Sequence, residues 1–314
     1  MKNYTLLIIV SFFCSILVAQ QKSNSLLHLN RAEKILFLGN SITYDGRYVA
    51  MIESVLLSSH FIKGTAIINL GLPSETVSGL SEDNHANGEF ARPCLFDRLE
   101  SILQKIKPDV VFACYGMNDG IYLPFDSVRF KAYQDGIEKL YMEALKSGVK
   151  RIILITPPVH DDPDLGLDGY NQVLDRYSTW LLEQRKNKNW EVIDLHFPMK
   201  KYLESRRRID PTYKLAPDGI HPEQEGHWLM ARSIISYLNP TFPQVIKWDE
   251  YVAKHTYLPK LYEAVLKKQE LMKLALLRYT KHKRPGIPSG LTMEQANQQN
   301  KHLEKQISLL IKHD

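Results

Sequence analysis

The sequence is poor in cysteine and lacks any cluster of metal-ligating residues. It has three cysteines in 314 residues, and Cys14 lies inside an apolar N-terminal stretch. Cys94 and Cys114 are too few to form the disulfide framework of a small secreted domain. A bridge between these two is the less favoured alternative, because Cys114 lies in an apolar run where cysteine usually packs as a small hydrophobe. No His/Cys cluster has zinc-ligand spacing, so we expect no structural zinc.

The chain also lacks a strong charge bias, internal repeats and low-complexity tracts. Its formal net charge of +5 is modest for its length and does not indicate a nucleic-acid partner. The surplus is local, because residues 241–314 carry 13 Lys/Arg against 7 Asp/Glu. With 44% hydrophobic and 24% charged residues, the chain can bury a full core. This composition excludes a disordered protein.

One long apolar segment is present, at the N-terminus. It runs from Leu6 to Val18, follows Lys2 and ends in Ala19-Gln20, which is the layout of a secretory signal peptide. The segment is shorter than the roughly 20 apolar residues of a membrane-spanning helix. We therefore predict a signal peptide at residues 1–20, export to the periplasm or the extracellular space, and no stable membrane span.

Beyond this segment, short apolar runs alternate with segments of helical periodicity. Five runs are predicted as strands and end at or near turn residues: 34–38, 66–70, 110–115, 151–155 and 190–195. Helical segments lie between and after them, at 48–58, 95–106, 128–146, 170–185 and 223–238. The alternation predicts a parallel five-stranded sheet with helices on both faces, a three-layer α/β/α domain spanning residues 21–240.

The pattern changes after Asn239-Pro240. Two long helical segments, 248–278 and 293–311, flank a basic linker at 282–288, and no strand is predicted there. We expect residues 241–314 to form a helical C-terminal extension. Its basic residues are interpreted as a solvated helix face, with an anionic surface as the alternative ligand: Lys267, Lys268, Lys273, Arg278, Lys281, Lys283 and Arg284.

The loops at the carboxyl ends of the strands carry the candidate catalytic residues. Ligands bind at this edge of a parallel sheet. Ser41 follows the first strand and a glycine, a position suited to a nucleophile, but serine needs a base to take its proton. His221 is the candidate base, and Asp218, three residues before it, can hold one ring nitrogen while the other faces the serine.

Acyl transfer also requires donors aimed at the developing oxyanion. Three candidates follow the first three strands: the amide of Ser41, the amide of Gly71 and the side-chain amide of Asn118. Each feature alone is more often structural than catalytic. Their joint occurrence at strand ends favours a serine hydrolase.

Four sequence blocks carry a family resemblance, which covers about residues 34–238. Gly39-Asn-Ser-Ile-Thr43, Gly71, Gly116-Met-Asn-Asp119 and Asp218-Gly-Ile-His221 are similar to the conserved blocks of the SGNH hydrolases, also called GDSL-like lipases and esterases. The resemblance implies a flavodoxin-like sheet, catalytic roles for Ser41, Gly71, Asn118, Asp218 and His221, and no metal or organic cofactor. Asn40 departs from the aspartate usual at its position.

Further polar residues are expected near the site. Three follow the fourth strand and should lie on the rim, either binding a sugar hydroxyl or facing water: His160, Asp161 and Asp162. Three lie in the long connection after Gly71 and either border the substrate pocket or form a solvated loop: His85, Glu89 and Arg92. His196 and His227 are interpreted as structural.

These observations predict a secreted serine esterase that acts through an acyl-enzyme. Its substrate is expected to be a small-molecule or polysaccharide ester, with carbohydrate O-acetyl groups favoured and nucleic acid excluded. A lipolytic esterase or lysophospholipase is the alternative substrate class. A non-catalytic carbohydrate-binding module on the same fold is the alternative of another class. The oligomeric state stays open.

Overall fold

The computed structural model describes residues 29, 31–162, 169–243 and 247–312. The predicted signal peptide at residues 1–20 lies outside this part of the chain. No helix among the described residues has the length and apolar character needed to cross a bilayer.

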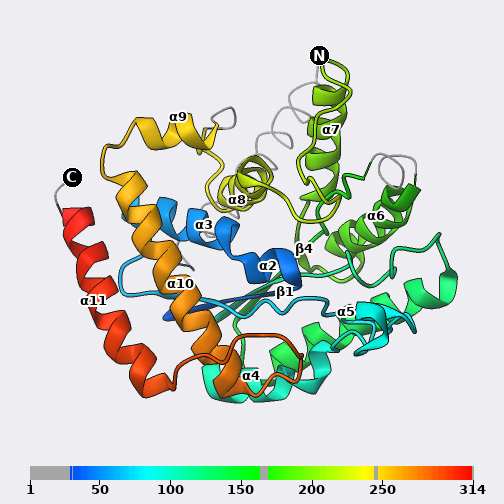
Figure 1. The fold of residues 1–314 in the computed structure, drawn as a ribbon, viewed down its shortest axis with the longest axis horizontal. Helices are drawn as coiled ribbons and strands as arrows, with labels where there is room; N and C mark the ends of the chain where they lie inside the picture. Colours follow the sequence, from blue (N-terminus) through cyan, green and yellow to red (C-terminus); the bar gives the residue numbers. More distant parts are fainter. Residues whose placement is uncertain (1–28, 30, 163–168, 244–246, 313–314) are drawn as a thin grey trace, which may run out of the picture.

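A five-stranded parallel sheet forms the centre of the fold (Figure 1). Its strand order is β2-β1-β3-β4-β5, and the strands are β1 (Lys34–Gly39), β2 (Ala66–Asn69), β3 (Val110–Cys114), β4 (Arg151–Ile155) and β5 (Glu191–Ile193). Gly39 pairs with Cys114 at the carboxyl ends of the two central strands, so the loops that follow β1 and β3 begin side by side. The predicted α/β fold class is confirmed.

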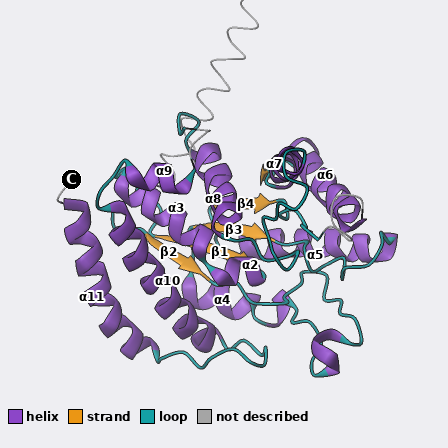
Figure 2. Cartoon of the chain, turned by 45° about the horizontal axis from the view of Figure 1, so that its top comes forward, coloured by secondary structure: helices purple, strands orange, loops and turns teal. Residues whose placement is uncertain are grey.

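Helices cover both faces of the sheet. Helices α3 (Arg47–Ser58) and α8 (Gln224–Leu238) lie on one face, and α4 (Leu99–Ile106), α5 (Ser127–Lys146) and α6 (Asn171–Asn187) on the other (Figure 2). Strands covered twice must be apolar on both sides, and β3 is buried along its whole length. Phe37 of β1 stacks on Phe112 of β3 with ring centroids 4.7 Å apart, which fills the core between these central strands.

The helices differ from the sequence expectation in three places. The short α2 (Ser41–Asp45) and α7 (His196–Arg207) were not predicted. The segment expected as one helix at 248–278 forms two, α9 (Trp248–Ala253) and α10 (Leu258–Thr280). The interruption has a local cause, because Pro259 occupies the first turn of α10. A proline there lacks an amide that the first turn does not use, whereas inside a continuous helix it would clash with the preceding turn.

The C-terminal extension packs directly on the sheet domain. Helix α10 runs beside α3 and the edge strand β2, and α11 (Met293–Lys312) packs against α10 (Figure 1). Gln269 donates to the carbonyl of Ile67 at 2.9 Å, satisfying an acceptor on an edge that would otherwise be open to another strand. The expected solvated face is wrong for two of its lysines, because the side chains of Lys268 and Lys273 are only 13% and 3% exposed.

Both described cysteines are free thiols. Cys114 is buried at the end of β3, and burial raises its pKa to about 12. The alternative of a Cys94–Cys114 bridge is therefore not realised, and Cys114 packs as an apolar residue, as expected.

Candidate active site

Ser41 is placed by the sharp transition from β1 into α2. The side chain of Asn40 caps this helix by accepting from the amide of Ile42 at 3.2 Å, the role in which Asn and Asp are interchangeable. The departure from the family's usual aspartate thus keeps the local geometry. The left-handed Gly46, with φ 87°, ends α2 after one turn. Ser41 is therefore held at the start of a short helix that is capped at both ends.

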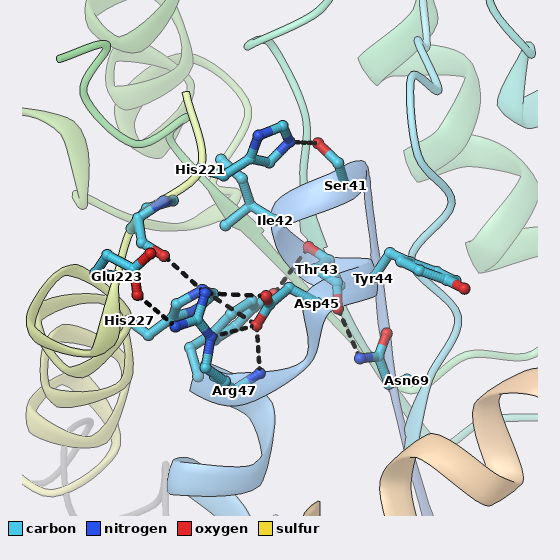
Figure 3. Close-up of polar contacts among 12 residues, drawn as sticks. Ser41, Ile42, Thr43, Tyr44, Asp45, Arg47, Asn69, His221, Glu223 and His227 are labelled. Carbon is cyan, nitrogen blue, oxygen red and sulfur yellow. Dashed lines mark hydrogen bonds and ion pairs between the residues drawn. The ribbon is translucent and has the colours of Figure 1, made fainter. Parts of the chain in front are cut away.

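The structure brings Ser41, His221 and Asp218 into one hydrogen-bonded row. His221 Nε2 lies 2.8 Å from Ser41 Oγ, and His221 Nδ1 lies 2.6 Å from Asp218 Oδ2. In Figure 3 the imidazole points directly at the serine hydroxyl. Nδ1 donates to the carboxylate, so Nε2 is left as the acceptor for the serine proton.

Asp218 also accepts from its own loop. Its Oδ1 binds the backbone amides of Ile220 and His221 at 2.9 and 2.7 Å. Partial burial acts to raise the pKa of this carboxyl, but the hydrogen bonds from His221 and Ile220 outweigh burial and hold the pKa below its ordinary value. The lowered pKa favours the ionised carboxylate, which can stabilise an imidazolium at His221.

Asp161 positions the loop that carries His221. It is fully buried, and its carboxylate accepts from the amides of Leu215 and Ala216 and pairs with Arg207. Its own amide donates to the carbonyl of Gly219 at 2.7 Å. Both alternatives expected for Asp161, a sugar contact or a solvated rim position, are therefore wrong. Asp161 instead holds the loop of His221 in place through contacts with residues about 50 positions away, which no local sequence pattern indicates.

Arg47 joins the segment of the nucleophile to the segment of the base. Its guanidinium binds Asp45 at 2.8 Å on one side, and Glu223 at 3.1 Å and the carbonyl of Pro222 at 3.0 Å on the other. Figure 3 shows this group lying between the end of α2 and the start of α8. The relative position of Ser41 and His221 is thus fixed by a charged bridge. This bridge was not predicted from the sequence.

The three candidate oxyanion donors differ in availability. The amide of Ser41 has no hydrogen-bond partner among the described residues. Asn118 donates one side-chain N–H to the carbonyl of Glu75 at 3.1 Å and accepts from Tyr122 at 2.9 Å, which orients the amide and leaves its second N–H without a described partner. The amide of Gly71 is already engaged by Asn69 Oδ1 at 2.9 Å. The role predicted for Gly71 stays a prediction that this geometry does not favour.

Gly71 instead allows two backbones to approach closely. A Cβ at this position would lie 2.2 Å from the amide nitrogen of Tyr44 and 2.6 Å from the carbonyl carbon of Thr43. Only glycine fits against α2 there. Asn69 completes the contact, because its side chain donates to the carbonyl of Thr43 at 2.6 Å (Figure 3).

Ser74 presents a different amide in the same loop. Glu75 N–H donates to the carbonyl of Leu72 at 3.3 Å, and Ser74 has φ 65°. These are the features of a type II turn with Pro73 at its second position and a left-handed third residue. The amide of Ser74 has no partner among the described residues. Pro73 at the second position is the sequence signal typical of this turn, and the donor role of Ser74 was not predicted from it.

Buried charges lock this loop against its neighbours. Asp119 accepts from the amides of Val77 and Ser78 at 2.8 and 2.9 Å and from Gly116 at 2.9 Å. Burial raises the pKa of Asp119, while these amides oppose the shift. One carboxylate therefore ties the loop after β2 to the turn that carries Asn118.

Glu75 and Arg98 form a second buried support for the same loop. Arg98 binds both carboxylate oxygens of Glu75, at 2.6 and 2.7 Å, and the carbonyl of Leu70 at 2.8 Å. Tyr115 adds a hydrogen bond to Glu75 at 2.7 Å. The ring of Tyr115 is buried, and its hydroxyl belongs to this network.

Aromatic and basic groups surround the Asn118 turn. Tyr122 packs against the buried His160, with ring centroids 5.8 Å apart, and Arg92 lies 5.4 Å from the centre of the Tyr122 ring. Arg92 is itself paired with Glu82 at 2.6 Å. Burial, the largest effect, lowers the pKa of His160. His160 and Arg92 are thus buried beside the Asn118 turn rather than facing water.

The two histidines interpreted as structural are both buried. His196 lies 2.7 Å from Asp175, and His227 lies 3.2 Å from Asp45. Within the described residues, no group of three or more His, Cys, Asp or Glu side chains is placed to hold a metal ion.

A parallel α/β sheet with a Ser-His-Asp row at the carboxyl ends of its strands defines a class, the serine hydrolases. Comparison with known proteins gives the family. The model of the GDSL-like Lipase/Acylhydrolase family matches residues 37–229, well over half of the chain. The chain therefore belongs to this family and is a serine ester hydrolase.

Individual known proteins are also similar to this chain. An acetylxylan esterase of Geobacillus stearothermophilus is 26% identical over 228 residues, which cover 66% of this chain and 94% of the relative. The crystal structure of a catalytic serine-to-alanine mutant of Axe2, an acetylxylan esterase from the same organism, is 24% identical with a TM-score of 0.51 and covers 66% of this chain and 94% of its own. A gut microbial diltiazem-metabolizing enzyme shares the fold at 20% identity and a TM-score of 0.53, covering 67% of this chain and 47% of its own.

Proposed function

We propose that this chain is an exported O-acetyl esterase that removes acetyl groups from acylated carbohydrate, with Ser41 as nucleophile, His221 as general base and acid, and Asp218 as the group that orients the imidazole. The observation that carries the catalytic assignment is the unbroken row Asp218–His221–Ser41, with distances of 2.6 and 2.8 Å. Both distances lie within the reach that proton transfer requires.

The proposed reaction is a double displacement. His221 Nε2 takes the proton of Ser41 Oγ as the oxygen attacks the ester carbonyl carbon, and the carbonyl electrons move onto its oxygen. Collapse of this intermediate expels the alcohol, which leaves with the proton from His221. Water repeats the sequence on the acyl-enzyme and releases the carboxylic acid and Ser41. Ester and water are thus converted to acid and alcohol.

The negative oxygen of the intermediate is assigned to three N–H groups: the amide of Ser41, the amide of Ser74 and the second side-chain N–H of Asn118. Each of these lacks a partner among the described residues. Gly71 is replaced in this set by Ser74, because the Gly71 amide is bound to Asn69. Preorganised donors of this kind supply about 3 to 4 kcal/mol each to catalysis.

Two supports favour an acetylated carbohydrate over a lipid. The relative at 26% identity, which this chain covers over 94% of its length, is an acetylxylan esterase. The hydroxyl of the half-buried Tyr122 donates to Asn118, and Arg92 lies against the Tyr122 ring; polar and aromatic surroundings of this kind suit a sugar rather than a long acyl chain.

The test measures acetate release from acetylated xylo-oligosaccharides and fatty-acid release from lysophosphatidylcholine, with the wild type and Ser41→Ala. We expect acetate from the oligosaccharides, no measurable fatty acid, and loss of acetate release in the variant. Fatty acid as the main product would replace the carbohydrate proposal with the lipolytic one. Equal hydrolysis of p-nitrophenyl acetate by wild type and Ser41→Ala would leave only a binding module.

Export is proposed from residues 1–20 alone. Expression of the full chain in a bacterial host, followed by N-terminal sequencing of the protein from the periplasm or medium, tests it. We expect a mature chain that begins at or near residue 21. An uncleaved chain that stays in the cytoplasm would contradict export. The assignment of the catalytic residues would be unaffected.

A further inference from the structure

Helix α10 lies outside the part of the chain that the family model matches. That match ends at residue 229, and the acetylxylan esterase relative has no counterpart for about a third of this chain. Yet α10 does not stand apart, because it runs along α3 and β2 (Figure 1) and also contacts the loops that carry the active site. Its contacts with those loops are polar and specific.

Lys273 of α10 reaches the helix that carries the nucleophile. Its ammonium donates to the carbonyl of Tyr44 and to the carboxylate of Glu270, and it lies 3.9 Å from the centre of the Tyr44 ring. The Lys273 side chain is 3% exposed. A lysine is rarely buried to this extent without a defined set of partners.

The contact falls where α2 is weakest. This helix has five residues, from Ser41 to Asp45. The last carbonyls of any helix accept no hydrogen bond from within that helix. Asn69 satisfies the carbonyl of Thr43, and Lys273 satisfies the next one, at Tyr44. A cation at the carboxyl end of a helix is also favoured by the helix dipole. One turn of helix, with Ser41 at its start, is thereby held at its far end by the extension.

A second cation of the extension touches the neighbouring loop. Arg284 donates from Nε to the carbonyl of Pro73 at 3.1 Å, and its guanidinium lies 5.1 Å from the centre of the Phe90 ring. Pro73 directly precedes Ser74, and Glu75 accepts from Asn118. The extension thus binds the backbone of both the nucleophile loop and the loop after β2.

We propose that Lys273 is a positioning residue of the esterase, which fixes the orientation of α2, and therefore of Ser41 Oγ toward His221, by holding the carbonyl of Tyr44. Lys273 does not touch the substrate. The proposal concerns ester hydrolysis itself and holds whichever acyl carrier is the natural substrate. It gives the basic extension a role inside the enzyme rather than on an anionic surface.

Lys268 supplies a matched control. It lies on the same helix, five residues before Lys273, is also largely buried, and pairs with Glu53 of α3. Glu53 is in the middle of α3 and makes no described contact with α2. Replacing Lys268 by Met removes a buried cation from the same interface and leaves the carbonyl of Tyr44 held.

The experiment compares Lys273→Met and Lys268→Met in the full chain with p-nitrophenyl acetate. Rates are normalised to the amount of Ser41 that an organophosphonate titrates, which removes differences in folded fraction. For Lys273→Met we expect kcat to fall about 10- to 100-fold with KM changed less than about 2-fold, because a misplaced nucleophile impairs the chemical step and not binding. For Lys268→Met we expect kcat within about 2-fold of wild type.

Equal kcat per titrated serine in the two variants would overturn the proposal and leave Lys273 a purely structural residue. If Lys273→Met does not fold, Lys273→Gln decides. Glutamine keeps a polar, helix-compatible side chain but is one atom shorter and cannot hold the Tyr44 carbonyl in the same way. We expect a reduced kcat with KM retained for Lys273→Gln, and a wild-type kcat would reject the positioning role. Neither outcome depends on activity toward carbohydrate.

Discussion

The guanidinium of Arg47 donates to the carbonyl of Pro222 across 3.0 Å. Arg47 begins the helix that follows the nucleophile segment, and Pro222 directly follows His221. Two segments about 175 residues apart in the chain are thereby held in register. This hydrogen bond does not involve the reacting atoms. It affects catalysis only by fixing the relative position of the two catalytic segments.

We expect Arg47→Ala to lower kcat about 10-fold, because the loops of Ser41 and His221 lose their shared anchor. Stability should fall by no more than about 1 kcal/mol, since the side chain is partly exposed and such ion pairs contribute little. Steady-state kinetics and urea unfolding measure both effects. A variant with unchanged kcat would show that the two loops keep their alignment without Arg47.

Asn118→Ala is expected to lower kcat by about 10²- to 10³-fold through loss of an oxyanion donor. Tyr122→Phe removes only the hydroxyl that orients the Asn118 side chain and should have a smaller effect. Kinetics of p-nitrophenyl acetate hydrolysis, with KM determined separately, distinguish the two. A larger loss in Tyr122→Phe than in Asn118→Ala would contradict the donor role.

Gly71→Ala is expected to destabilise the fold by about 3 kcal/mol, because the added methyl would overlap the backbone of Tyr44 and Thr43. Gly64→Ala is the control: a Cβ there meets nothing within 4 Å, and only its positive φ of 77° opposes the change. A loss of about 1 kcal/mol is expected for this control. Thermal or urea unfolding measures both. If Gly71→Ala were as stable as wild type, the close contact with α2 would be disproved.

The buried pair Glu75–Arg98 should be more sensitive to removal of one partner than of both charges. Arg98→Met leaves the Glu75 carboxylate buried without its counter-ion and is expected to cost about 3 to 5 kcal/mol. Adding Glu75→Gln to this variant should restore part of the loss, because the uncompensated charge disappears. Denaturant unfolding of the single and double variants measures the coupling. No recovery in the double variant would mean that shape and not charge dominates at this site.

His227 makes stability depend on pH. Burial, opposed by the charge of Asp45, lowers the pKa of His227 from 6.5 to about 4, so the folded state resists protonation that the unfolded state accepts. The contribution is complete above pH 6.5 and is lost as the pH falls from 6.5 toward 4, by about 2 kcal/mol at pH 5. Urea unfolding at pH 7.5 and pH 5 should show a smaller loss in His227→Gln than in wild type. Equal losses would show that His227 does not contribute.

The sheet was predictable because its signal is local. Strands covered on both faces must be continuously apolar, and runs such as Val110–Cys114 show this directly in the sequence. Ser41, Asp218 and His221 were found for a related reason: the strand end locates the serine, and the spacing of Asp218 and His221 lies within one turn. The rule that ligands bind at strand ends locates Ser41, whereas Asp218 and His221 lie in the loop after α7, and only the tertiary structure brings that loop beside the serine.

The helix boundaries and the set of oxyanion donors were harder to predict from the sequence. The break before α10 had a visible cause in Pro259, but helical periodicity continues across it and hides the interruption. Glycine at position 71 is compatible with close approach to a substrate or to another part of the chain, and its missing Cβ in fact allows the approach of Tyr44. The amide of Gly71 is bound by the side chain of Asn69, whereas the amide of Ser74 is free among the described residues. Sequence spacing alone does not indicate this difference.

The amino-acid sequence by itself determined the layers of the fold and the residue types of the catalytic row, because apolar periodicity and short-range spacing are written along the chain. Tertiary structure alone decided the supporting contacts: Asp161 under the histidine loop, Arg47 between the two catalytic segments and Lys273 beneath the nucleophile helix. Each is a buried or half-buried polar group whose partner lies tens to hundreds of residues away. The role of such a polar group depends on which segments pack together. The hydrophobic pattern of the sequence determines that packing, but it does not indicate which polar groups become partners.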